Sequence, residues 1–172
     1  MAARFHELTV AEIVRDTPDA VAIGFAVPPE LQEEFAFRPG QYLTLAAEID
    51  GEEARRSYSI CSVPGDPHLR VGVKKVADGR FSRFVNERLA VGQSMRVMTP
   101  EGRFTALIGG RHDYLLIAAG SGITPMLSIA RTVLGHEPDS TVTLVYGNRS
   151  TDTIMFLEEL EDLKDRYLGR LT

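Results

Sequence analysis

Cysteine is almost absent from this sequence: Cys61 is the only one among 172 residues. A single thiol excludes a disulfide within the chain, and it excludes any four-cysteine zinc or iron–sulfur site. Cys61 fits a reducing compartment, and we interpret it as a buried structural thiol rather than a redox centre. The four histidines are scattered and form no metal-ligand spacing such as H-x-x-x-H, so we expect no metal site.

Excess positive charge and long apolar runs are also missing. The formal net charge of −5 argues against a nucleic-acid-binding surface. The basic pairs Arg55-Arg56 and Lys74-Lys75 suit a phosphate ligand better than a polyanion. No apolar run approaches the roughly 20 residues that span a bilayer, and the N-terminus lacks the apolar core of a signal peptide. We therefore expect a cytoplasmic protein that binds neither nucleic acid nor membrane.

The first hundred residues alternate short apolar segments with turns. Six short strands at this spacing predict an antiparallel barrel or sandwich over residues 1–108. One short helix is expected among them, from Ser82 to Leu89, with Ser82 as its N-cap. The expected strands are Leu8 to Val14, Val21 to Val27, Tyr42 to Ala46, a segment around Tyr58, Leu69 to Val76 and Met95 to Met98.

The pattern changes after Gly109-Gly110. Tyr114 to Ala119 is continuously apolar, as expected for a parallel strand covered on both faces. A helix, a second apolar strand and another helix are expected next, and this order predicts the start of a parallel-sheet α/β domain over residues 112–172. The final residues resemble the start of a third strand, so we expect the native chain to continue past Thr172. The expected elements are a helix from about Thr124 to Leu134, a strand from Val142 to Tyr146 and a helix from about Thr153 to Tyr167.

Three short motifs place reactive or polar groups at the ends of these elements. Arg56–Ser59, with the sequence RSYS, combines an arginine that can clamp a diphosphate with a tyrosine that can pack on a planar ring. Gly79–Ser82, with the sequence GRFS, forms a turn that leads into a helix, and the free N–H groups at the start of that helix attract phosphate. Gly120–Pro125, GSGITP, follows a strand and opens a helix, as a dinucleotide loop does, although Pro125 replaces the last glycine of G-x-G-x-x-G. Each motif alone also fits an ordinary structural role, and it is their order that favours a flavin and nucleotide site.

In this order the motifs resemble the ferredoxin–NADP reductase superfamily, in which R-x-Y-S, G-x-x-S and G-[ST]-G-x-x-P lie along a flavin barrel and a nucleotide lobe. Pro39–Tyr42 and Pro100–Phe104 look like that family's barrel landmarks, so the resemblance runs from about Phe5 to Thr172. Residues 56–62 and 146–150 look most like the reductase components of bacterial oxygenases, of the phenylacetyl-CoA or 3-ketosteroid hydroxylase type. The resemblance implies a six-stranded antiparallel FAD-binding barrel, followed by the start (β-α-β-α) of a parallel-sheet NAD(P)-binding domain.

The resemblance also implies a role for each matching residue. Arg56 would hold the FAD pyrophosphate and Tyr58 would lie against the isoalloxazine ring. Ser59 and Thr124 would flank the point of hydride transfer, and we assign them as the catalytic residues. Arg149 would meet an adenosine ribose or a 2′-phosphate, which leaves NADH and NADPH both open. The other implied cofactor contacts are Ser57, Gly72, Val73, Lys74, Lys75, Gly79, Arg80, Phe81, Ser82, Gly120, Gly122 and Asn148.

The implied reaction moves hydride from NAD(P)H onto flavin N5 and passes electrons singly to an iron–sulfur acceptor that serves an oxygenase. The acceptor would be a ferredoxin domain or an oxygenase component, with its two-iron cluster outside this chain. Two alternatives stay open: a stand-alone ferredoxin–NADP or flavin reductase, and a flavin-binding fragment or regulatory relative without turnover. The sequence leaves the identity of the acceptor, the oxygenase substrate and the oligomeric state undetermined.

Overall fold

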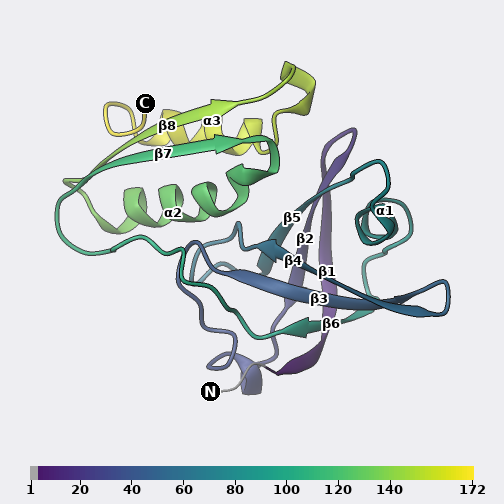
Figure 1. Cartoon of the computed structure of the whole chain (residues 1–172). Helices are drawn as coiled ribbons and strands as arrows, with labels where there is room; N and C mark the ends of the chain where they lie inside the picture. Colours follow the sequence, from purple (N-terminus) through teal and green to yellow (C-terminus); the bar gives the residue numbers. More distant parts are fainter. Residues whose placement is uncertain (1–3) are drawn as a thin grey trace.

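The computed structural model describes residues 4–172 and shows a β-barrel joined to a smaller α/β lobe (Figure 1). Six antiparallel strands form one sheet in the order β4-β3-β6-β1-β2-β5, which confirms the predicted strand class of the first hundred residues. A bridge between Ile60 and Val71 joins the two edges of this sheet and closes the barrel. The strands are β1 (Phe5–Thr17), β2 (Ala20–Ala26), β3 (Tyr42–Ile49), β4 (Glu52–Ser59), β5 (Leu69–Lys74) and β6 (Ser94–Met98).

Strand β2 shows how the barrel and the lobe share one element. Val21 and Ile23 point into the barrel core, as the alternation of a strand requires. Ala20 and Ala22, on the opposite face, pack in a second apolar cluster with Ile123 of the lobe. The strand is therefore buried on both faces, and small alanines occupy the face on which the lobe lies.

Helix α1 (Arg80–Glu87) begins two residues before the predicted start, so the expected Ser82 N-cap is wrong. Gly79 is the N-cap residue, and Ser82 lies within the first turn. The Ser82 hydroxyl donates to the Gly79 carbonyl at 3.1 Å and accepts the Val76 N–H at 3.2 Å. A β-carbon at Gly79 would lie 2.3 Å from the Ser82 Oγ, so only glycine fits this turn. The serine thus closes the turn instead of capping the helix.

The lobe contains two parallel strands, β7 (Asp113–Ala119) and β8 (Thr141–Gly147), with α2 (Ile123–His136) and α3 (Leu157–Arg166). Both helices pack on one face of the strands, around Leu116 and Val142. The expectation that Tyr114 to Ala119 is covered on both faces is wrong within residues 4–172: Leu115 and Ile117, on the other face, are each 63% exposed. No helix in this described part of the chain is long and apolar enough to cross a membrane.

The predicted start of a third strand is confirmed at the end of the chain. Leu171 forms a parallel bridge with Val142. The Thr172 N–H donates to the Val142 carbonyl at 2.9 Å, and the Leu144 N–H donates to the Thr172 carbonyl at 2.7 Å. The third segment therefore lies next to β8, in parallel with it.

Helix α3 begins later than the predicted Thr153. A 3₁₀ turn spans Thr151–Thr153, and the α-helix starts only at Leu157. Phe156 separates the two because its φ of +59° lies in the left-handed region, which interrupts a right-handed helix. Its backbone N–H is bound by Asp16 of β1, a contact that no local pattern in the sequence indicates.

Polar contacts join the barrel and the lobe around a shared apolar cluster. Arg70 of β5 pairs with Glu159 of α3 at 2.7 Å, and Arg131 of α2 pairs with Asp66 at 3.0 Å. Cys61 is fully buried in this shared cluster, and burial raises the pKa of its thiol to about 12. The expected burial of Cys61 is therefore confirmed. The predicted boundary between domains, at residues 108–112, stays a prediction and falls in the segment that connects β6 to β7.

Candidate cofactor-binding site

A cleft of about 460 Å³ lies where the barrel meets the lobe. Four segments that are distant in sequence reach it: the end of β4, the end of β5, the first turn of α1 and the loop that starts α2. Three of them carry the motifs found in the sequence. The lining residues are Arg56, Ser57, Tyr58, Ser59, Gly72, Lys74, Val76, Gly79, Phe81, Ser82, Ser121, Gly122, Thr124 and Pro125.

The β4 wall combines a cation with an aromatic ring. The Arg56 guanidinium is exposed and donates a hydrogen bond to the Arg55 carbonyl at 2.7 Å. Tyr58 is partly buried, and burial raises its pKa to about 12 against the opposing effect of Arg56. The phenol is therefore uncharged near neutral pH. Its ring centroid lies 6.0 Å from that of Phe81 at a tilt of 36°, which gives this end of the cleft an aromatic surface.

The α1 side of the cleft is positive. The first N–H groups of a helix lack partners within the helix and attract anions, and α1 carries no acidic residue in its first turn. Lys74 lines the same cleft, and its ammonium lies 3.8 Å from the Asp19 carboxylate. Together with Arg56 these groups suit the two negative charges of a diphosphate.

The lobe side of the cleft comes very close to β5. Thr124 is 4% exposed, and its hydroxyl donates to the Ser121 carbonyl at 3.0 Å. Its methyl faces Gly72: a β-carbon added at Gly72 would lie 2.6 Å from the Thr124 Cγ2. The absence of a side chain at Gly72 is therefore what lets the glycine loop approach the barrel.

The structure brings many of the predicted site residues together but not all of them. The side chain of Val73 is buried in the barrel core, and Lys75 pairs with Glu87 at 3.3 Å. The predicted site residues that line the cleft are Arg56, Ser57, Tyr58, Ser59, Gly72, Lys74, Gly79, Phe81, Ser82, Gly122 and Thr124; those that do not are Val73, Lys75, Arg80, Gly120, Asn148 and Arg149.

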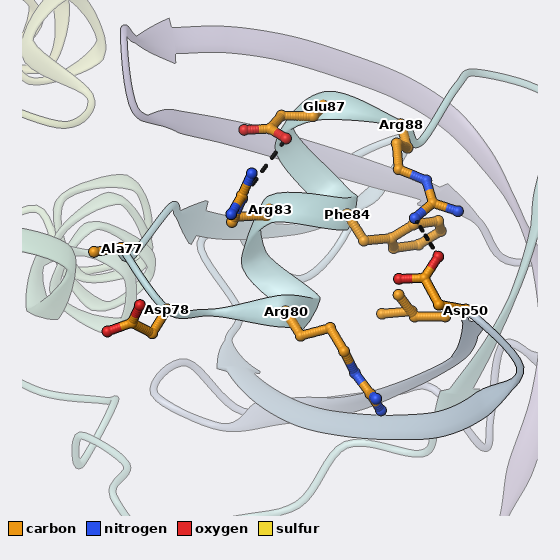
Figure 2. Close-up of a pocket in the computed structure, with 9 residues that line it drawn as sticks. Asp50, Ala77, Asp78, Arg80, Arg83, Phe84, Glu87 and Arg88 are labelled. Carbon is orange, nitrogen blue, oxygen red and sulfur yellow. Dashed lines mark hydrogen bonds and ion pairs between the residues drawn. The ribbon is translucent and has the colours of Figure 1, made fainter.

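Arg80 lies in a second cavity, of about 520 Å³, on the outer side of α1 (Figure 2). Its guanidinium pairs with Glu52 of β4 at 2.5 Å, away from the cofactor cleft. The cavity also contains the Arg88–Asp50 pair at 3.0 Å. The expected phosphate contact of Arg80 therefore stays a prediction, and in this structure its guanidinium is bound by a carboxylate of β4.

Gly120, Asn148 and Arg149 lie just past the ends of β7 and β8. Gly120 has a φ of +50°, which favours glycine, and its carbonyl accepts the Tyr146 hydroxyl at 2.9 Å. The side-chain nitrogen and oxygen of Asn148 are buried and have no hydrogen-bond partner among residues 4–172. Arg149 is exposed. The Asn148 amide lies beside the Tyr146 hydroxyl, whose pKa is raised by burial and lowered in part by this amide.

Three lining residues were absent from the predicted set. Ser121 and Pro125 belong to the glycine motif, so their position within GSGITP was a usable signal. Val76 follows the last residue of β5 and is 56% exposed. Its place depends on the turn that Gly79 and Ser82 close, and no sequence pattern marks it.

Two family models define the class to which this fold belongs. Residues 7–106 match the oxidoreductase FAD-binding domain family, and residues 116–172 match the oxidoreductase NAD-binding domain family. The chain belongs to the oxidoreductase FAD-binding domain family, whose model matches more than half of it. The positive groups and the aromatic wall of the cleft fit the diphosphate and the ring of FAD.

Two relatives and one solved structure make the likeness more specific. The chain is 53% identical to a component of the 1,2-phenylacetyl-CoA epoxidase of Escherichia coli, covering 97% of this chain and 48% of that protein. It is 43% identical to the ferredoxin reductase component of the 3-ketosteroid-9-alpha-monooxygenase of Rhodococcus rhodochrous, covering 96% and 47%. The chain thus spans about half the length of these curated relatives. It matches the fold of the ferredoxin-NADP⁺ reductase of Plasmodium falciparum with a TM-score of 0.83, at 18% identity over 98% of this chain and 72% of that one.

Proposed function

We propose that this chain is the flavin-binding part of a reductase that takes hydride from NAD(P)H and delivers electrons singly to an iron–sulfur acceptor serving an oxygenase. The observation that carries the proposal is the cleft itself. Tyr58 and Ser59 of the barrel line one wall, and Gly122 and Thr124 of the glycine loop line another. Bound FAD would supply the hydride and single-electron chemistry. The protein's task is then to orient two planar rings against each other and to exclude water.

Each wall has a proposed task. Arg56, Lys74 and the first turn of α1 bind the diphosphate, because they are the positive groups of the cleft. Tyr58 packs on the flavin ring. Ser59 presents a hydroxyl near the ring nitrogen that receives hydride, and Thr124 closes the opposite side.

The nicotinamide nucleotide is proposed to approach from the lobe. Gly120 and Gly122 leave room for its diphosphate, and the amide of Asn148, just past the end of β8, supplies hydrogen bonds. Arg149, which is exposed beside it, is available to a ribose or a 2′-phosphate. This arrangement supports a nicotinamide cofactor and leaves both NADH and NADPH to be tested.

The acceptor is proposed from the relatives, one of which is named as a ferredoxin reductase component of a monooxygenase. A single cysteine cannot supply the four ligands of a two-iron cluster, so the cluster is placed on a ferredoxin domain or an oxygenase component outside these 172 residues. A cytoplasmic location is part of the same proposal, and the unpaired Cys61 thiol is consistent with it.

A flavin-binding chain without turnover is the second candidate. The exposed apolar residues Leu115, Ile117 and Val145, on one face of the lobe sheet, favour it, because parallel sheets are normally covered on both faces. Mixing the FAD-loaded chain with NADH or NADPH in the absence of oxygen separates the two candidates. Bleaching of the flavin absorbance supports the reductase. A flavin that stays oxidised with both nucleotides supports the binding chain.

A further inference from the structure

Asp16, at the end of β1, reaches from the barrel to the lobe. Both of its carboxylate oxygens accept the Phe156 N–H, at 2.9 and 3.0 Å, across 140 residues of sequence. Burial raises the pKa of Asp16, and the Phe156 N–H offsets this only in part. Burying a carboxylate is energetically unfavourable unless its hydrogen bonds compensate. Here those bonds go to one distant backbone group, which suggests that the group must be held in place.

Phe156 is the group that is held. Its φ of +59° is unusual for a residue with a bulky side chain, yet it is only 2% exposed. Such a backbone persists only where the surroundings over-determine it. Here the surroundings are the Asp16 carboxylate on one side and the apolar cluster shared by the barrel and the lobe on the other.

The strained segment packs directly behind the cofactor cleft. A β-carbon at Gly72 would lie 3.0 Å from the Phe156 Cζ and 3.1 Å from the Met155 Cε, as well as 2.6 Å from Thr124. Gly72 and Thr124 both line the cleft. Met155 and Phe156 therefore support the point at which barrel and glycine loop come closest.

The same segment is also tied to the glycine loop. The Tyr146 hydroxyl accepts the Met155 N–H at 3.2 Å and donates to the Gly120 carbonyl at 2.9 Å. A continuous path of hydrogen bonds and peptide links thus runs from Asp16 in the barrel, through Phe156 and Met155, to Tyr146 and Gly120. Each hydrogen bond on this path holds a backbone N–H or carbonyl group, and not the mobile end of a side chain.

We propose that Asp16 and Tyr146 are positioning residues for hydride transfer: they hold the Met155–Phe156 segment so that the glycine loop stands at the correct distance from the flavin. The inference rests on the proposed reductase function. A displacement of about 1 Å between reacting groups can lower a rate about a hundredfold, so a backbone clamp of this kind controls rate more than binding.

A purely structural clamp is the competing explanation, since Arg70–Glu159 and Arg131–Asp66 also join the two parts. The two explanations differ in what they predict for the FAD-loaded chain. A structural clamp alters stability and leaves the limiting rate of flavin reduction unchanged. A positioning clamp alters that rate while FAD affinity is retained.

The test compares the FAD-loaded parent chain with Asp16→Ala, Asp16→Asn and Tyr146→Phe. Asp162→Ala is the matched control, because Asp162 is an exposed carboxylate of α3 with no ion pair among residues 4–172. The measurements are FAD affinity, the limiting rate of flavin reduction by NADH or NADPH, and two structural readouts. These are exchange of the Phe156 amide hydrogen and labelling of Cys61, which is buried between barrel and lobe.

We expect Asp16→Ala and Tyr146→Phe to reduce flavin about ten- to a hundredfold more slowly, with FAD affinity within about twofold of the parent. Asp16→Asn keeps an acceptor oxygen and should stay within about threefold, as should Asp162→Ala. Faster Phe156 exchange and faster Cys61 labelling should accompany the loss of rate in Asp16→Ala. Tyr146→Phe keeps the test decisive if Asp16→Ala does not fold.

Parental reduction rates in Tyr146→Phe and in any Asp16→Ala that folds would overturn the positioning role. If Asp16→Asn reduced flavin as slowly as Asp16→Ala, the hydrogen bond to the Phe156 N–H would not be the cause of the slower rate. If the parent itself binds FAD but neither nucleotide reduces it, the proposed function fails, and the role in hydride transfer fails with it. In that case unchanged Phe156 exchange in Asp16→Ala would show that even the clamp is absent.

Discussion

The methyl group of Thr124 packs against the bare α-carbon of Gly72, where a β-carbon would lie only 2.6 Å away. This contact joins the glycine loop to the barrel wall of the cleft. It depends on glycine for space and not for conformation, since the φ of Gly72 is not positive. The contact links the sequence of β5 directly to the geometry of the proposed hydride-transfer site.

Gly72→Ala should therefore push the lobe away from the barrel. We expect a loss of about 1–3 kcal/mol in the free energy of unfolding, as for overpacked cores, together with slower flavin reduction. Thermal melting and anaerobic mixing with NAD(P)H measure the two effects. Gly135→Ala, in α2, is the control, because the nearest atom to its β-carbon is 3.8 Å away. Parental stability and rate in Gly72→Ala would contradict the close approach.

Arg56→Ala should weaken FAD binding more than it alters the fold. The loss of a charge-assisted contact to the diphosphate is worth about 1.5–3 kcal/mol, which corresponds to roughly a ten- to hundredfold rise in Kd. Fluorescence titration of FAD measures the affinity, and circular dichroism reports the fold. Arg38→Ala removes an exposed arginine outside the cleft and should leave the Kd unchanged. Equal FAD affinity in Arg56→Ala and the parent would remove Arg56 from the diphosphate site.

Glu137 should make the stability of the chain depend on acid pH. It is 2% exposed and accepts the Gly109 N–H and the hydroxyls of Ser140 and Tyr114. Burial alone would raise its pKa, but these hydrogen bonds outweigh burial and leave the pKa below 4.5. The unfolded chain then binds more protons in the window between the folded pKa and 4.5, so stability is present above that window and is lost as the pH falls through it.

Glu137→Gln should be less stable than the parent near neutral pH and should lose less stability between about pH 5 and about pH 3. Urea unfolding at a series of pH values measures both. Glu161→Gln, an exposed change on α3, should follow the pH curve of the parent. A Glu137→Gln curve parallel to that of the parent over this range would show that the carboxylate does not stabilise the fold in its charged form.

Cys61 should be unreactive in the native protein. Burial raises its pKa to about 12, and the thiolate is the reactive form. Labelling with a thiol-specific reagent near neutral pH should be slow, because it requires the barrel and the lobe to separate or the chain to unfold. Rapid labelling of the folded chain would mean that barrel and lobe separate readily.

The sequence predicted those helices and strands that are determined by the residue pattern within the segment itself. Alternating apolar residues in segments such as Leu69–Lys74 indicate strands. The order of the RSYS, GRFS and GSGITP motifs favours a shared site, and these motifs supply three of the four segments that line the cleft. The sequence could not predict the direction of a side chain that depends on a distant partner. Arg80 turns outward because Glu52 pairs with it, which is a contact across 28 residues.

The start of α3 shows the same limit. Its residues have good helical pattern from Thr153 onward, but Asp16, 140 residues earlier, binds Phe156 in a left-handed conformation and delays the helix. The exposed face at Leu115 and Ile117 was likewise missed, because a continuous apolar run predicts cover on both faces and does not show which elements supply it.

Flavin reduction by a nicotinamide nucleotide is the central claim, and one measurement tests it most directly. The chain is loaded with FAD, freed of unbound flavin and mixed with NADH and with NADPH in the absence of oxygen, while the flavin absorbance is followed. The account predicts a yellow protein that retains FAD and is bleached by at least one of the two nucleotides. A colourless chain that cannot be reconstituted with FAD would contradict the account.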